Sequence, residues 1–321
     1  MTSGHARPHP SRVAVVGTGN VGASFAYALV LSGLAAEIVL VDANARRAEG
    51  EAMDLTHAVP FAKPTRIWAG SLADTAGAAV TVISAGAVQK PGESRLDLVR
   101  KNDGIFASIV PQVAAANPGG IIVVATNPVD VLTFRTIERS GLPPGRVLGS
   151  GTILDTARFR ARLAERLGLD ARSVHAYIIG EHGDSEVPVW SSANVGGMPL
   201  SDYCAVHGID FSDAERTAIF EGTRDAAADI IDRKGATYYA VAAGLIRIVE
   251  AILRDQHTIL PVSSLIGAHY GIGDVCLSLP SVVGRGGVER LVPIGLSAGE
   301  AAALRHSAAI LRDTIDSLEG E

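Results

Sequence analysis

The first half of the chain alternates short apolar runs with longer segments that have the spacing of helices. The runs are rich in β-branched residues and read RVAVVG, EIVLVD, AVTVIS, GIIVVATN and RVLGS. Strands that are apolar on both faces are typical of a parallel sheet with helices on both sides. Gly or Pro stands at the ends of the helical segments, as expected at helix boundaries. This βαβ repetition predicts an α/β fold with a doubly wound parallel sheet.

The pattern changes after Gly149, and the second half is predicted to be α+β in character. The expected elements are a helix over 151–168, a strand over 173–180, a polar loop that leads into another strand, helices over about 211–233 and 237–254, strand-like pieces over 258–292 and a closing helix from residue 298. No internal repeat or low-complexity segment is visible in the sequence. A chain of 321 residues that is 47% apolar can bury a large core, so we expect one compact unit with two lobes.

Charge and hydropathy argue against several classes of protein. The formal net charge is −6 and there are no basic tracts, which argues against a nucleic-acid partner. No uncharged apolar run reaches the ~18 residues that a membrane span needs. The first ten residues, MTSGHARPHP, lack the apolar core of a secretory signal and are expected to be a flexible tail. A cytoplasmic protein is the prediction.

The cysteines favour a reducing compartment and no metal. Cys204 and Cys276 are too few for a disulfide framework. Cys204 and His207 have a spacing found in metal sites, but no second pair of ligands accompanies them, and structural zinc needs four ligands.

The turn after the first expected strand carries the glycine pattern GTGNVG. Gly17 permits a tight turn, Gly19 lets the backbone approach a pyrophosphate, and Gly22 lets the helix pack closely on the strand. The N–H groups at the start of the helix, around Asn20 and Val21, would face the phosphates together with the helix dipole. The pattern alone is weak evidence. Within a βαβ unit it predicts a Rossmann-type dinucleotide site.

Asp42 directly follows the second expected strand, 20 residues after the last glycine of the turn. A carboxylate at this place accepts hydrogen bonds from a ribose hydroxyl and repels a 2′-phosphate, so NAD is favoured over NADP. Arg46 and Arg47 could in principle meet a 2′-phosphate, but a solvated helix face suits them better; an ordinary turn with a solvated aspartate is the alternative. We predict an NAD-binding domain over 1–149 and a substrate/catalytic domain over 150–321.

A histidine, an aspartate and an arginine form the candidate catalytic group. His182 lies in IIGEHGDSEVP, directly after an expected strand. Asp155 and Arg158, in LDTARFR, are three residues apart and share one face of a helix. Asp155 can accept from an imidazole nitrogen and favour the charged ring, while Arg158 offers a planar fork suited to a carboxylate. A surface salt bridge and a histidine without a chemical role are the alternatives.

Seven longer segments resemble the NAD-dependent L-lactate dehydrogenases of the lactate/malate dehydrogenase family. In chain order they are GTGNVGASFAYAL, AEGEAMDLTHA, QKPGESRLDLV, ATNPVD, GSGTILDTARFR, IIGEHGDSEVPVWS and KGATYYAVA. The resemblance extends from about residue 12 into the C-terminal helix. It implies a hydride transfer between NADH and the carbonyl carbon of pyruvate, with L-lactate as the product.

The resemblance also implies a role for each matching residue. His182 would donate a proton to the carbonyl oxygen and act as the base in the reverse direction, and Asp155 would orient and stabilise the imidazolium. Arg158 would bind the substrate carboxylate, and Arg95 would stabilise charge on the carbonyl oxygen. Asn127 would bond the same oxygen or the nicotinamide side.

Thr237 would line the pocket beside the substrate methyl group. Both Asn127 and Thr237 belong to residue types that often cap turns and helices, which is the alternative for each.

The polar segment 85–95 is expected to be a lid over bound substrate, with hinges at Gly86 and Gly92 and with Arg95 at its end. Gln89 is expected to select the acid. An arginine there would pair with a second carboxylate, as in malate dehydrogenases, whereas an amide cannot neutralise one. Glu93 adds a negative charge to the lid. Pyruvate is therefore expected to fit better than oxaloacetate.

Arg160 is five residues beyond Asp155, so its side chain points about 140° away and does not serve the same pocket. The resemblance to the bacterial fructose 1,6-bisphosphate-activated type implies that Arg160 and His175 bind this effector across a subunit interface. Two ordinary interface residues are the alternative. We expect a homotetramer, with dimers as a looser form, whose affinity for pyruvate rises with the bisphosphate.

Two rival functions stay open on the sequence. The first is a malate or other 2-hydroxy acid dehydrogenase of the same fold. Gln89 argues against malate, and the size of the pocket, which the sequence does not reveal, decides whether bulkier acids fit. The second is a non-catalytic dinucleotide-binding scaffold. A scaffold would show degraded chemistry, whereas the histidine, the aspartate and both arginines of the candidate site are intact.

Overall fold

The structure is a computed structural model that describes residues 11–87 and 95–319. The expected tail over 1–10 and most of the expected lid, including Gln89, Gly92 and Glu93, lie outside the described residues. No helix in the described part of the chain is long and apolar enough to cross a membrane.

A nine-stranded sheet in the order β12-β11-β10-β6-β5-β4-β1-β2-β3 forms the centre of the molecule. The first six strands pair in parallel. They are β1 (Arg12–Val16), β2 (Glu37–Val41), β3 (Arg66–Ala69), β4 (Val80–Ile83), β5 (Ile121–Val124) and β6 (Val147–Gly149). The order reverses between β1 and β4, which creates the crevice where doubly wound sheets bind ligands. The predicted doubly wound sheet is confirmed.

Alternate residues of each parallel strand pack against different helices. Val13 and Val15 of β1 lie in one apolar cluster with α1 (Asn20–Ser32) and α2 (Ala45–Ala58). The intervening residues of the strand lie in a second cluster with α3 (Arg95–Ala116). Because both faces are covered, the strands are apolar throughout rather than alternating.

The helix α4 (Val129–Ser140) packs on the α3 side of the sheet. On the other side, α9 (Tyr239–Leu253) from the second half of the chain packs against α1. The two halves therefore share a core.

The second half also extends the first sheet. Three antiparallel strands follow in the sheet, namely β10 (Thr258–Ile266), β11 (Val275–Gly284) and β12 (Gly287–Leu291). The strand β10 pairs antiparallel with β6 and so joins them to the parallel strands. A separate three-stranded sheet holds β7 (Val174–Ile179), β8 (Val187–Val195) and β9 (Met198–Pro199).

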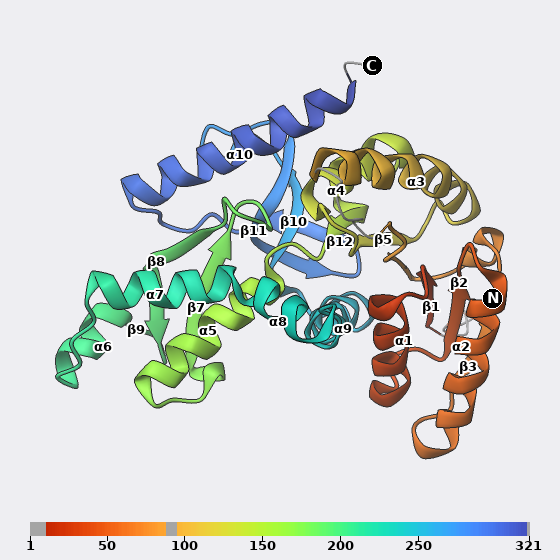
Figure 1. Cartoon of the computed structure of the whole chain (residues 1–321), viewed down its shortest axis with the longest axis horizontal. Coiled ribbons are helices and arrows are strands. Elements are labelled where there is room, and N and C mark those ends of the chain that lie inside the picture. Colours follow the sequence, from red (N-terminus) through yellow and green to blue (C-terminus); the bar gives the residue numbers. More distant parts are fainter. Residues whose placement is uncertain (1–10, 88–94, 320–321) are drawn as a thin grey trace, which may run out of the picture.

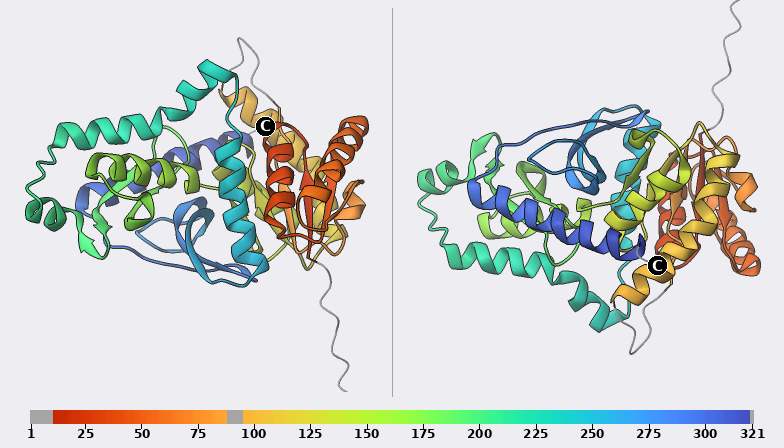
Figure 2. Two further views of the ribbon diagram at one scale, coloured as in Figure 1. Left: turned by 90° about the horizontal axis from the view of Figure 1, so that it is seen from below. Right: turned by 90° about the horizontal axis from the view of Figure 1, so that it is seen from above.

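Five more helices complete the second half. They are α5 (Ile153–Leu167), α6 (Leu200–Val206), α7 (Asp213–Arg224), α8 (Ala226–Lys234) and α10 (Ala298–Glu319). Figure 1 shows β1–β3 with α1 and α2 at one end of the molecule and α5–α7 with β7–β9 at the other. The long helix α10 lies over β10 and β11, and Figure 2 shows the same division from two further sides.

Several features differ from the sequence prediction, among them the short helix α6, which was not expected. The strand β3 was not anticipated, because the edge segment RIWA is only partly buried and its apolar signal is short. The helix expected over 211–233 is interrupted at Asp225, which separates α7 from α8. The Arg224 side chain donates to the Asp225 carboxylate at this break.

Candidate active site

The glycine turn between β1 and α1 is closed on its protein side. A Cβ at Gly22 would lie 1.9 Å from the carbonyl oxygen of Gly17, and one at Gly17 would lie 2.4 Å from the backbone nitrogen of Ala85. Gly17 also has a φ of 98°, which L side chains rarely adopt. Gly19 has open space within 4 Å. The backbone at Gly19 is therefore accessible to a ligand as bulky as a pyrophosphate.

Helix α1 begins at Asn20, and Gly19 is its N-cap without a side-chain cap. The first N–H groups of a helix have no partner within it, and they carry the positive end of the helix dipole. No acidic residue stands in the first turn of α1 to compete for them. The turn fits a dinucleotide pyrophosphate, with Asn20 and Val21 at the position that the sequence predicts.

Asp42 lies beside this turn at the end of β2. Its Oδ2 accepts hydrogen bonds from the Thr18 backbone N–H at 2.7 Å and from the Thr18 hydroxyl at 2.9 Å, and its Oδ1 accepts from the Asn44 N–H at 2.9 Å. Burial raises the pKa of Asp42, but these hydrogen bonds and the charge of Arg47 leave the pKa below its usual value. The carboxylate therefore stays ionised, as an acceptor for ribose hydroxyls must be.

Asp155, Arg158 and His182 come together as the sequence predicts. The Nδ1 of His182 lies 2.5 Å from Asp155 Oδ2, and Nη1 of Arg158 donates to Asp155 Oδ1 at 3.0 Å. The Asp155 side chain is 3% exposed and the His182 side chain is 23% exposed. The Asp155 carboxylate thus bonds both the imidazole and the guanidinium, and part of the imidazole remains exposed to a ligand.

The buried carboxylate raises the proton affinity of the imidazole. Burial lowers the pKa of His182, but the charge and hydrogen bond of Asp155 and the charges of Asp130 and Glu186 raise it to about 9. Burial alone would raise the pKa of Asp155, but the imidazolium of His182 and the guanidinium of Arg158 lower it below its usual value. The imidazole of His182 is therefore protonated at neutral pH.

Sequence reasoning missed two buried acids beside His182. Asp130, in the first turn of α4, accepts the His182 backbone N–H on Oδ2 at 2.7 Å. Glu186 is 6% exposed, and burial with the nearby charge of Asp155 raises its pKa to about 8. Both stand in segments that resemble the family, ATNPVD and EHGDSEVPVWS, but nothing local in either segment indicates where the side chain points.

A third missed residue, Asn102 of α3, joins two predicted parts of the site. Its Oδ1 accepts the N–H of Ala87, at the start of the segment expected to be a lid, at 2.7 Å. Its Nδ2 donates to the Asn127 carbonyl oxygen at 2.8 Å. Asn102 is 1% exposed. It ties the predicted substrate residue Asn127 to Ala87, which follows the expected hinge Gly86.

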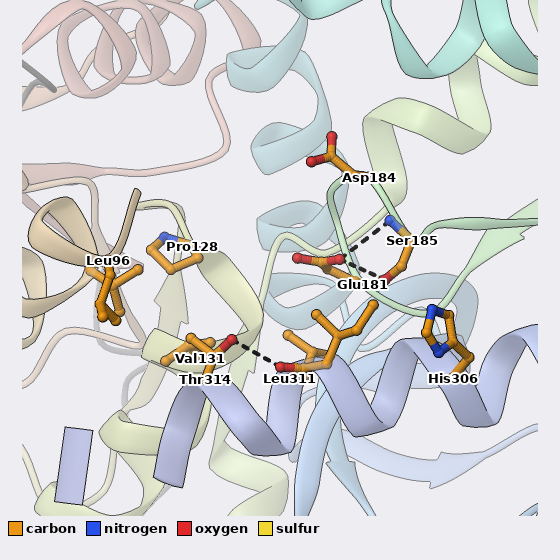
Figure 3. A pocket seen from close by; sticks show the side chains of 11 residues that line it. Leu96, Pro128, Val131, Glu181, Asp184, Ser185, His306, Leu311 and Thr314 are labelled. Carbon is orange, nitrogen blue, oxygen red and sulfur yellow. Dashed lines mark hydrogen bonds between the residues drawn. The ribbon is translucent and has the colours of Figure 1, made fainter. Parts of the chain in front are cut away.

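A cavity of 510 Å³ lies next to these groups, between α3, α4, α10 and the loop after β7. Its lining includes Leu96, Pro128 and Glu181, which are the chain neighbours of Arg95, Asn127 and His182. Figure 3 shows Leu96 and Pro128 on one side, and Glu181 with its hydrogen bonds from Ser185 on the other.

Arg95 itself is the first residue of α3. The cavity therefore lies beside the segments that carry Asn127 and His182, although neither residue is among those that line it.

Thr237 and the two candidate effector residues are not among the residues that line this cavity. Thr237 is half-buried in the connection between α8 and α9. Arg160, on α5, donates from Nε to the Ala176 carbonyl oxygen at 2.8 Å and lies over the Tyr177 ring. His175 is exposed on β7, one residue before that carbonyl. Arg160 thus bonds the strand that carries His175.

The thiols of Cys204 and Cys276 are both buried and free. The ring of His207 contacts Tyr203. Within residues 11–87 and 95–319, one group of three side chains could hold a metal ion, namely Asp255, His257 and Glu289 at the surface. Its histidine already bonds Glu289 at 2.8 Å, and nothing in the cluster points to an ion.

Comparisons with known proteins agree with the geometry over the whole chain. The NAD-binding domain model of the lactate/malate dehydrogenases matches residues 11–149, and the model of their alpha/beta C-terminal domain matches residues 152–321. The fold and the glycine turn, with these matches, define an NAD-dependent oxidoreductase. The chain belongs to the lactate/malate dehydrogenase family.

Curated relatives and solved structures give the same picture. The chain is 52% identical to the L-lactate dehydrogenase of Priestia megaterium, covering 96% of this chain and 97% of that protein. It is 51% identical to the L-lactate dehydrogenase of Synechococcus sp. (strain JA-3-3Ab), covering 95% and 98%. A crystal structure of the minor L-lactate dehydrogenase of Enterococcus mundtii in its ligands-bound form superposes with a TM-score of 0.94 at 42% identity, covering 97% and 99%.

Proposed function

We propose that this protein is an L-lactate dehydrogenase that reversibly converts pyruvate and NADH to L-lactate and NAD. The observation that carries the proposal is the shared carboxylate of Asp155, which holds an imidazole at 2.5 Å and a guanidinium at 3.0 Å. A small α-keto acid has one carboxylate and one adjacent carbonyl. Arg158 and His182 offer one partner for each group.

In the reaction, NADH supplies the hydride to the carbonyl carbon. His182 donates its proton to the carbonyl oxygen, and the negative charge of Asp155 stabilises the imidazolium before that transfer. Arg158 binds the carboxylate by its planar fork. In lactate oxidation the neutral His182 accepts the hydroxyl proton. Because the pKa of His182 is raised to about 9, the protonated imidazole that pyruvate reduction requires predominates at neutral pH.

Four further residues are proposed to complete the substrate site. Arg95 stabilises negative charge that develops on the carbonyl oxygen, where a donor contributes most. Asn127, which Asn102 fixes through its carbonyl, donates to the same oxygen or to the nicotinamide side. Thr237 lines the methyl side of the pocket. Gln89, which lies outside the described residues, is proposed to select the substrate.

The direct test follows NADH absorbance after mixing the purified protein with pyruvate, and separately with oxaloacetate. Rapid oxidation of NADH by pyruvate, abolished in His182→Asn, supports the proposal. Preference for oxaloacetate or for a bulkier 2-keto acid would assign the protein to another dehydrogenase of the family. No oxidation with any 2-keto acid would make it a non-catalytic scaffold.

Selection of pyruvate is proposed to rest on Gln89. An uncompensated carboxylate costs several kcal/mol when buried, so an amide at this place disfavours a dicarboxylate. Gln89→Arg is expected to raise the ratio of kcat/KM for oxaloacetate over pyruvate about a hundredfold or more. Gln89→Asn is the matched control. A ratio that stays unchanged in both variants would show that Gln89 does not select the substrate.

Activation by fructose 1,6-bisphosphate is proposed at Arg160 and His175. The placement of the Arg160 side chain beside the strand that carries His175 supports a shared anion site. Pyruvate saturation curves at slightly acid pH, with and without millimolar bisphosphate, test it. Curves that superimpose would rule activation out.

We also propose that the protein is cytoplasmic and assembles into homotetramers. Large apolar side chains at the surface favour self-association: Met53 is 63% exposed and Phe61 is 90% exposed. A single monomeric mass at micromolar concentration, by light scattering, would contradict the assembly. The proposed domains are 1–149 for NAD and 150–321 for substrate.

A further inference from the structure

We propose that Glu186 controls substrate affinity through its own charge: the uncharged carboxyl group leaves Arg158 free to bind the carboxylate of pyruvate, and the ionised carboxylate repels it. The inference rests on the proposed function, since it assumes that Arg158 binds the substrate. It adds a second proton, besides that of His182, on which substrate binding depends.

The strand geometry directs Glu186 toward helix α5. Val187, the first residue of β8, packs in the apolar cluster that also holds residues of α10. Successive side chains of a strand point to opposite faces, so the side chain before Val187 lies on the other face of the small sheet. On that face Ile178 of β7 packs with Phe159 of α5. Glu186 therefore approaches the helix that carries the proposed substrate arginine.

The carboxyl group of Glu186 is buried without a full set of hydrogen-bond donors. The residue is 6% exposed, and its Oε1 has no hydrogen-bond partner among the described residues. Glu181, in the same loop, is equally buried, but its Oε2 accepts from the N–H and the hydroxyl of Ser185. Burial without donors penalises a carboxylate more than a neutral carboxyl group. The surroundings of Glu186 therefore favour its uncharged form.

Charged groups from three elements face Glu186. Asp155 and Arg158 come from α5, His182 from the loop that also carries Glu186, and Arg224 from α7. Burial and the charge of Asp155 raise the pKa of Glu186 to about 8, although the three cations oppose this change. The charge of Glu186 therefore changes within the range of pH in which the site works.

Three other acids face these partners. Asp225 accepts a hydrogen bond from Arg224, on which the charge of Asp184 also acts, and Asp130 faces His182. Their charges are the same for both forms of Glu186 near pH 8, so they do not alter the comparison between the two forms.

The charge of Glu186 decides whether the site has a surplus positive charge. Asp155, Arg158 and protonated His182 are bonded to one another and sum to one positive charge, which the carboxylate of pyruvate neutralises. An ionised Glu186 cancels this charge before the substrate arrives, so pyruvate would bring an uncompensated negative charge into a buried place. Pyruvate therefore binds the uncharged form, and above about pH 8 its binding takes up a proton.

The test is Glu186→Gln, which keeps the shape of the side chain and removes its ionisation. The probe is oxamate, in which an amino group replaces the methyl group of pyruvate, so that its amide carbonyl does not accept a hydride. Fluorescence of bound NADH measures the dissociation constant of oxamate at pH 6.5 and at pH 9. The two proteins should bind oxamate equally well at pH 6.5. At pH 9 the variant should bind about fivefold more tightly or better, because most of the unaltered protein then carries the repelling charge.

The sign of the difference separates this role from an effect through His182. The charge of Glu186 raises the pKa of His182, so its removal lowers that pKa and would by itself weaken oxamate binding at pH 9. A variant that binds oxamate more weakly than the unaltered protein at pH 9, or equally well, overturns the inference. The same change in affinity at both pH values would show a merely structural role and would also overturn it.

Two further variants keep the outcomes distinct. Glu186→Met has no charge and needs no hydrogen bond, so it repeats the test if the buried amide of glutamine disturbs folding, and it should show the same tighter binding at pH 9. Asp232→Asn removes an exposed acid of α8 and should leave oxamate binding unchanged at both pH values. The melting temperature of Glu186→Gln at pH 9 should not fall, since a buried charge is gone.

Failure of the proposed function is separate from failure of this inference. If the unaltered protein does not oxidise NADH with pyruvate, or if His182→Asn retains the activity, the proposed function fails. If the unaltered protein is active and His182→Asn is inactive, but Glu186→Gln and Glu186→Met gain no affinity for oxamate at pH 9, only the role of Glu186 is wrong.

Discussion

Two separate groups of cationic side chains come from helix α5 and from strand β7 with the loop that follows it. On one face of α5, Arg158 bonds the buried Asp155, and the loop that follows β7 brings His182 to the same carboxylate. On another face, Arg160 donates to the Ala176 carbonyl oxygen and lies over the Tyr177 ring, and His175 of β7 is exposed.

The first group is fixed before any ligand arrives, because each cation already has its counter-charge. In the second group the hydrogen bond to a neutral carbonyl leaves the positive charge available to an anionic ligand. The comparison predicts that substitutions on the first face change the chemistry and that substitutions on the second change only its regulation. Since α5 is common to both, an anion bound at Arg160 acts on the helix that also positions Arg158.

The largest effect is expected from Asp155→Asn. The amide keeps the volume but leaves the imidazole and the guanidinium without their counter-charge in a buried place, where such a loss costs about 3–5 kcal/mol. That corresponds to a fall in kcat of about a hundredfold to several thousandfold. Steady-state NADH oxidation with pyruvate measures it. A fall of less than about tenfold would mean that the pair is not preorganised by this carboxylate.

Arg158→Gln should act mainly on substrate affinity. The substrate carboxylate loses its charged partner, so KM for pyruvate should rise about a hundredfold or more. NADH affinity should be unchanged, because Arg158 lies on α5 and not in the glycine turn before α1. Fluorescence titration with NADH provides that control. A joint loss of NADH binding would indicate a general structural defect.

The fold could be predicted from the sequence further than the site could. The apolar runs before residue 150 and the helix over 95–116 follow from local pattern, because their covering layers make burial continuous along each element. The antiparallel strands β10–β12 were expected as strands, but their place beside β6 depends on pairings between distant segments. The edge strand β3 and the break at Asp225 left no clear local pattern.

Within the site, the residues that sequence reasoning found are those whose types recur in a motif, such as Asp155 and Arg158 at helical spacing. The residues that it missed act through long-range contacts. Asp130 reaches His182 across 52 residues, and Asn102 reaches Asn127 across 25. The first turn of a helix is an ordinary place for an aspartate, so the sequence predicts nothing unusual at Asp130.

A smaller effect is expected from pH alone. Pyruvate reduction needs the protonated imidazole, whose pKa is raised to about 9, so kcat/KM should decline above that pH. Because the folded pKa lies above the unfolded value, this group also stabilises the fold fully below about pH 6.5 and loses that contribution towards pH 9. Glu186, with a pKa raised from 4.5 to about 8, acts in the same direction. Denaturant unfolding between pH 6.5 and 9.5 should show falling stability, and Asp155→Asn should have a shallower slope.

The smallest effect on basal chemistry is expected from Arg160→Gln, the matched partner of Arg158→Gln on the same helix. The Arg160 side chain points away from the catalytic cluster, so kcat without effector should change by less than about twofold, as for surface substitutions. The response to the bisphosphate should disappear, since a phosphate group would lose its charged partner.

Pyruvate saturation curves of Arg160→Gln, with and without bisphosphate, measure both the basal rate and the response to the effector. If Arg160→Gln lowered basal kcat as strongly as Arg158→Gln raises KM, the two faces of α5 would not be functionally distinct. A normal basal rate with an intact bisphosphate response would instead place the effector elsewhere and leave the catalytic face of the helix as proposed.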